Sequence, residues 1–112
     1  MTETVDAQGT VVGIGLLVAV GVLAYGAVVS DSILGVDSMT AAMWVFALTL
    51  GVISLLHAFF GEYNLAWGHG GAAFGWVFVL AGSSGFQVAI GLVLLVLSAC
   101  YIAILTIRLR SD

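Results

Sequence analysis

The chain has 112 residues, of which 62% are hydrophobic and only 7% are charged, and its mean hydropathy is +1.26. Water-soluble domains carry about a quarter charged residues, so this composition cannot cover a water-facing surface. Without Lys and with only Arg108 and Arg110, the chain lacks the basic surface of a nucleic-acid-binding protein. The lone Cys100 excludes an intrachain disulfide framework. The composition therefore predicts an all-α, polytopic integral membrane protein with a single transmembrane domain over residues 1–112.

Three segments of the chain are clear candidates for membrane spans. A helix needs about 20 apolar residues to cross a hydrocarbon core roughly 30 Å thick. Three segments meet this requirement: 9–29, 39–60 and 86–107. Polar stretches separate them, since 30–38 contains Asp31 and Asp37 and 61–65 contains Glu62. We expect both stretches to be loops.

The segment 66–82 is ambiguous. It has 17 residues, five of which are Gly. Gly weakens a helix in water by up to about 1 kcal/mol, yet in membranes it allows close packing. The sequence Trp-Val-Phe-Ala-Leu at 44–48 recurs as Trp-Val-Phe-Val-Leu at 76–80, which favours a helix here. We predict a compact bundle of four transmembrane helices, with three spans plus a re-entrant segment as the alternative.

Orientation depends on the two arginines. Lys and Arg collect at cytoplasmic ends of spans, so Arg108 and Arg110 are predicted to anchor a cytoplasmic C-terminus. With four spans the N-terminus is also inside, and with three it is outside. The acidic leader at 1–10 argues against a cleaved signal peptide, with cleavage after Gly26 as the alternative. We expect a multi-pass protein of the cell membrane, although a viral envelope protein needs only the same spans.

The acidic balance of the chain has two interpretations. The net charge is −4, and all six carboxylates lie in predicted loops or tails. Either the sign is the chance outcome of having few charges, or the chain comes from an extreme halophile with an archaeal-like composition. High salt screens the repulsion between carboxylates in such an organism.

Small residues spaced four apart indicate how the helices pack. Gly9 with Gly13, and Gly71 with Gly75, both form GxxxG motifs. The hydrophobic effect does not pair helices within lipid, so close backbone approach at small residues must contribute. These motifs predict either tight packing within the chain or a seam between copies.

One group of polar residues is a candidate site. His57 lies near the end of the second predicted span, Glu62 lies in the following turn, and His69 opens the next segment. In a helical hairpin these three side chains share one membrane face. They either meet water and headgroups, form a proton-sensitive site, or ligate haem or zinc. The last interpretation lacks a dense ligand motif, so we expect no metal and no cofactor.

Residues 58–78 contain an acidic–aromatic pair, an Asn, and Gly beside aromatic residues: Glu62-Tyr63, Asn64, Trp67-Gly68 and Phe74-Gly75-Trp76. This order loosely resembles a hairpin of the acetate/succinate–proton symporter family. The spacings differ, the Asn-Pro-Ala-Pro segment of that family is absent, and its fold has more spans than this chain can form. The resemblance covers about a fifth of the chain, and it implies transport only as an alternative.

Two functions remain. The first is a small non-catalytic membrane protein, either a structural or accessory subunit or a self-associating bundle. Its partners would be the lipid bilayer and copies of itself or a larger membrane complex. The alternative is an oligomeric channel or proton-coupled carrier for a small solute that uses His57, Glu62 and His69.

Overall fold

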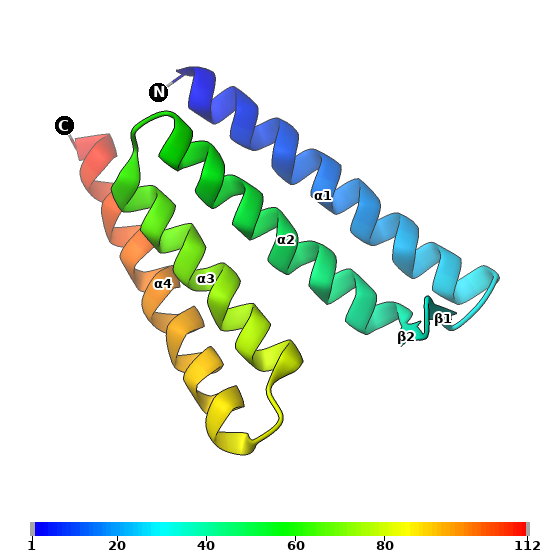
Figure 1. The fold of residues 1–112 in the computed structure, drawn as a ribbon. Coiled ribbons are helices and arrows are strands. Elements are labelled where there is room, and N and C mark those ends of the chain that lie inside the picture. Colours follow the sequence, from blue (N-terminus) through cyan, green and yellow to red (C-terminus); the bar gives the residue numbers. More distant parts are fainter. Residues whose placement is uncertain (1, 112) are drawn as a thin grey trace.

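The computed structural model describes residues 2–111, which form four helices and one short hairpin (Figure 1). The helices are α1 (Thr2–Val28), α2 (Ser38–Phe59), α3 (Tyr63–Ala81) and α4 (Gly85–Ser111). The predicted all-α class is therefore confirmed. Helices α1, α2 and α4 are each long and apolar enough to cross a membrane, as an integral membrane protein requires.

The boundaries of three helices differ by three or more residues from the prediction, and one of them, α4, runs four residues past the predicted end at 107. Helix α1 starts at Thr2, well before the predicted start of the span at residue 9. Helix α3 starts at Tyr63, inside the predicted loop 61–65. Helix α3 is one uninterrupted helix of 19 residues, but it is not apolar enough to join the three candidate spans, because Asn64, His69 and its glycines lower its hydropathy. A fourth span is therefore not confirmed.

The loop predicted at 30–38 contains a small antiparallel hairpin of strands β1 (Ser32–Ile33) and β2 (Val36–Asp37). The sequence analysis missed these strands because each has only two residues. Leu34 and Gly35 connect them with φ values of 52° and 81°. Positive φ at both central residues is the geometry that matches a two-residue turn to the twist of the strands.

Asp37 ends the hairpin and caps α2. Its carboxylate accepts hydrogen bonds from the backbone N–H of Thr40 at 2.9 Å and from the Thr40 hydroxyl at 2.7 Å. These two bonds to the charged form, the backbone one first, lower the pKa of Asp37. The cap fixes where α2 begins and therefore the direction in which it leaves the hairpin.

The helices are arranged as a row in which each packs against its neighbours in sequence (Figure 1). Extensive contacts among the described helices join α1 to α2, α2 to α3, and α3 to α4. The predicted compact bundle is therefore not confirmed. Short connections make sequence neighbours antiparallel partners, and the molecule measures 49 × 34 × 21 Å.

Small residues bring the helices of the row together. A side chain at Gly15 would strike Thr49 of α2, and one at Gly70 would lie 3.0 Å from the Ser54 hydroxyl. That hydroxyl also donates to the Ala66 carbonyl at 2.6 Å, which links α2 to α3. The chain therefore uses close backbone approach and an interhelical hydrogen bond where a soluble protein would use a large apolar core.

Very few side chains are buried. The buried hydrophobic residues are Ala42, Ala47, Ile53 and Ala72. Buried polar residues are as numerous, and three of them, Thr4, His57 and His69, line one cavity. In an apolar environment such polar groups are costly unless they have partners or a function, so this end of the molecule is the candidate site.

Candidate functional site

The turn between α2 and α3 places Glu62 over His57. Gly61 has φ +78°. Its N–H donates to the Ala58 carbonyl at 3.1 Å, and the N–H of Glu62 donates to the His57 carbonyl at 2.8 Å. This pair of bonds is the Schellman motif, which ends a helix at a residue with positive φ. The positive φ of Gly61 therefore determines where the Glu62 carboxylate lies.

His57 and Glu62 also interact through their side chains. The Nδ1 atom of His57 lies 3.2 Å from Oε1 of Glu62. The side chain of His57 is 3% exposed and that of Glu62 is 20% exposed. Because an ionised carboxylate can only accept, Nδ1 of His57 is the donor. The bond joins the last turn of α2 to the residue before α3.

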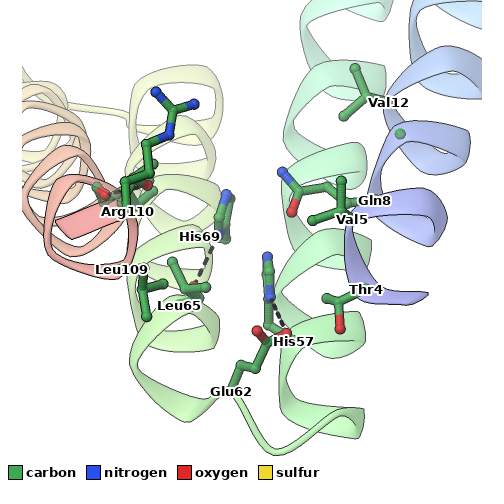
Figure 2. A pocket seen from close by; sticks show the side chains of 13 residues that line it. Thr4, Val5, Gln8, Val12, His57, Glu62, Leu65, His69, Leu109 and Arg110 are labelled. Atoms are coloured by element: carbon green, nitrogen blue, oxygen red, sulfur yellow. Dashed lines mark hydrogen bonds and ion pairs between the residues drawn. The ribbon is translucent and has the colours of Figure 1, made fainter. Parts of the chain in front are cut away.

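His69 lies beside His57 on the neighbouring helix. Its Nδ1 donates to the Leu65 carbonyl, one turn earlier in α3, at 2.9 Å. The two imidazole rings are stacked, with centroids 5.0 Å apart and an interplanar angle of 21°. Figure 2 shows the rings side by side, each with Nδ1 towards the α2–α3 turn. The sequence analysis placed His57, Glu62 and His69 at one membrane face, and the structure brings these side chains together.

The partners of the two rings determine their tautomers. Glu62 Oε1 and the Leu65 carbonyl are both acceptors, so the proton of each neutral ring lies on Nδ1. Each Nε2 then carries a lone pair. Nε2 of His57 is the buried side-chain polar atom that has no hydrogen-bond partner among the described residues. The site therefore offers two neighbouring acceptors.

A cavity of about 520 Å³ adjoins the imidazoles. Figure 2 shows α1 on one side of it and the end of α4 on the other, with His57 and His69 between them. Its apolar lining includes Val5, Val12 and Leu109. A mainly apolar cavity of this size with a few polar groups is typical of a small-molecule site.

The sequence analysis missed the contribution of α1. Thr4 and Gln8 line the cavity together with Val12, and Thr4 is 3% exposed. These residues were assigned to the leader or to the edge of the first span. Their spacing of four residues, which aligns side chains on one helix face, was the available signal. It becomes meaningful only because α1 extends back to Thr2.

The remaining predicted residues have different surroundings. Arg110 lines the cavity, and both Arg108 and Arg110 lie exposed in the last turn of α4. A side chain at Gly71 would meet Ser98, and one at Gly75 would lie 2.9 Å from the Gly91 carbonyl.

The motif on α1 has no such neighbour. A side chain at Gly9 or Gly13 would meet no described atom within 4 Å. Gly9 also lines the cavity. Of the two GxxxG motifs, the one on α3 therefore packs within the chain, whereas the one on α1 does not.

Metal ligands are sparse at this site. Within residues 2–111, no group of three or more His, Cys, Asp or Glu side chains is arranged to hold a metal ion. Glu62 faces Nδ1 of His57, on the opposite side of the ring from Nε2. The polar side chains that line the cavity together with the two rings include Thr4 and Gln8 of α1 and Arg110 of α4.

The fold and the site define a class: an all-helical protein with three helices able to cross a membrane and a buried imidazole pair at one end. Comparison with protein families, curated proteins and solved structures finds no match to the chain.

Proposed function

We propose that the chain is a non-catalytic membrane protein that acts by associating with copies of itself. The observation that carries this proposal is the open row of helices. Helix α1 packs extensively only on α2, and only 6% of its apolar window is buried. Apart from the residues that line the cavity, the rest of its surface is available to lipid or another protein chain, and the GxxxG face at Gly9 and Gly13 suits a second helix.

The proposal includes α3 as a fourth span. Its support is geometric: α3 is continuous over 19 residues and lies between α2 and α4, both of which are candidate spans. At about 1.5 Å per residue, that length approaches the thickness of the hydrocarbon core. Four spans put both termini on one side, and the arginines at the end of α4 favour the cytoplasm for that side.

The experiment is the oligomeric state of the chain in lipid nanodiscs, measured by native mass spectrometry. We expect the natural protein to form a defined oligomer. Gly13→Leu should shift it towards monomer, because the added side chain blocks close approach to another chain. Gly51→Leu is the matched control, since Gly51 is also open but lies on α2. A monomer for the natural protein, or equal effects of both variants, contradicts the proposal.

A second candidate function is proton-coupled conduction of a small solute. The specific observation in its favour is the buried His57, whose Nδ1 is paired with a carboxylate and whose Nε2 has no described partner. A buried imidazole beside a carboxylate is the kind of group that a proton-sensitive gate uses. A single row of helices has no enclosed lumen, so this function also requires an oligomer.

Solute flux into liposomes tests the second candidate. Flux that depends on pH in the natural protein and loses that dependence in His57→Gln supports it. Flux that is indifferent to pH and to the substitution excludes it. Tyr101→Phe is a suitable control, because Tyr101 is exposed on α4 and does not line the cavity.

A further inference from the structure

We propose that the cavity between α1 and α4 binds a neutral, membrane-soluble small molecule whose O–H group donates a hydrogen bond to Nε2 of His57 or His69. This inference concerns a cavity within one chain, although Gly9 belongs both to the lining of that cavity and to the face proposed for self-association. It starts from the fixed tautomers of the two rings. Both Nδ1 atoms already donate to acceptors, so both Nε2 atoms must accept.

The burial of His57 gives the site an acceptor that a bound donor could satisfy. His57 is 2% exposed, and its Nε2 has no described partner. A buried acceptor without a donor costs about 1–3 kcal/mol, and natural proteins rarely leave one unsatisfied. Figure 2 shows Nε2 of each ring directed away from the α2–α3 turn, into the space between α1 and α4. Nε2 of His57 has almost no accessible surface, so a donor from the cavity reaches it only if neighbouring side chains shift, whereas His69 is 8% exposed.

The size and lining of the cavity indicate what carries the donor. A volume of about 520 Å³ is far more than one water molecule or ion needs and falls in the range of small organic ligands. Val5, Val12 and Ile102 provide an apolar lining. Because α1 and α4 have no extensive contact with each other, the space between them can admit a molecule from the lipid phase.

Charge favours a neutral ligand over a cation or an anion. The Arg110 side chain lines the same cavity as the imidazoles, so it disfavours a metal cation, and no third His, Cys, Asp or Glu completes a described ligand set. The Glu62 carboxylate disfavours an anion. Thr4 and Gln8 add further polar groups from α1 that can bond a hydroxyl head. A phenol or alcohol with an apolar tail meets all of these conditions.

The test uses 4-hexylphenol and its methyl ether, 4-hexylanisole, which has the same ring and tail, one additional methyl group and no donor. The chain contains only two His, so protein labelled with ¹⁵N-histidine and purified without a His tag reports on this site alone. Spectra are recorded in phosphatidylcholine nanodiscs at pH 8.5, where imidazole is ordinarily neutral. We expect the phenol to shift an Nε2 signal saturably and the ether to bind about tenfold more weakly, as loss of one hydrogen bond implies.

Variants separate the cavity from the imidazoles. Leu109→Trp adds bulk to the cavity lining on α4 while both imidazoles are kept, and it should abolish the phenol-induced shift. Leu92→Trp, on an exposed face of α4 away from the cavity, should leave the shift unchanged. His57→Gln should weaken binding, and if that variant does not fold, Leu109→Trp still tests the proposal. A repeat in phosphatidylglycerol, which carries hydroxyl groups, tells whether a lipid head supplies the donor.

Three outcomes would overturn the inference. Equal binding of the phenol and the ether would mean that the site is an apolar groove and that no hydrogen bond to Nε2 forms. A shift with Zn²⁺ but not with the phenol would make it a metal site. No saturable shift with either compound would mean that the cavity binds no donor. None of these outcomes bears on the oligomeric state, so failure here is distinguishable from failure of the proposed function.

Discussion

Gly71 and Gly75 of α3 lie against α4, whereas a side chain added at Gly9 or Gly13 of α1, which have the same spacing, would meet no described atom beyond its own helix within 4 Å. The two motifs are equivalent in sequence and differ in what faces them. Gly75 faces Gly91 of α4, so backbone meets backbone there, whereas Gly71 faces the Ser98 side chain. Four-residue spacing of glycines therefore makes close packing available, and the opposite face decides whether it occurs.

Gly91→Ala is expected to have the largest effect on stability, because it disrupts the close contact between α3 and α4. A methyl group at that position would lie 2.7 Å from the Gly75 carbonyl oxygen and 2.9 Å from Phe78 and Val79. Backbone on α3 cannot yield as a flexible side chain can, so we expect a loss of about 1–3 kcal/mol in the free energy of unfolding. Denaturation in mixed micelles measures it. An unchanged free energy would mean that α3 and α4 are farther apart than the structure describes.

The turns of the two hairpins allow a second comparison. Gly61→Ala and Gly35→Ala each replace a glycine at positive φ, +78° and +81°, so each should cost about 1–2 kcal/mol. Only Gly61 belongs to the turn that carries Glu62. We therefore expect Gly61→Ala alone to alter the ¹⁵N signals of His57. A change of those signals in Gly35→Ala would contradict this assignment.

Removing the Glu62 carboxylate should have a smaller effect on stability. Glu62→Ala removes the acceptor of the His57 Nδ1–H group, and because the carboxylate is partly exposed, water can replace it in part. We expect a loss of about 1 kcal/mol, the low end for an unsatisfied buried donor. Glu62→Gln keeps an acceptor oxygen and should lose less. Thermal unfolding measures both variants, and equal losses would indicate that the hydrogen bond is unimportant.

The Asp37 cap predicts that the stability of the first turn of α2, at the opposite end of this helix from His57, depends weakly on pH. The hydrogen bonds from Thr40 lower the pKa of Asp37 from 3.8. Its stabilising contribution is therefore fully present above that pH and is lost as the pH falls through the lowered pKa. The amide signal of Thr40, followed by NMR during acidification, reports the loss. Asp37→Asn keeps a capping oxygen without titrating, so its amide signal should stay constant.

The smallest effect on stability is expected at the GxxxG motif on α1. Gly13→Ala adds a methyl group where no described atom lies within 4 Å, so the free energy of unfolding of the isolated chain should change by less than about 0.5 kcal/mol. The measurement matches the one for Gly91→Ala. A loss as large as that of Gly91→Ala would mean that the GxxxG motif on α1 is packed as closely as the one on α3.

Part of the candidate site was predictable because it is local. The apolar length of 9–29, 39–60 and 86–107 identified three helices, and His57, Glu62 and His69 are separated by one short turn. A hairpin of that length must bring them near one another. Their bonding was not predictable, because it depends on the positive φ of Gly61 and on the rotamers of two rings.

The amino-acid sequence determined that the chain is helical and apolar enough for a membrane, because hydropathy and helical period are properties of residues close together in the chain. Only the tertiary structure decided which glycine motif is packed, that the helices lie in a row, and that Thr4 and Gln8 face the imidazoles across a cavity. Those features join segments many residues apart, and their arrangement follows from how whole helix surfaces fit one another.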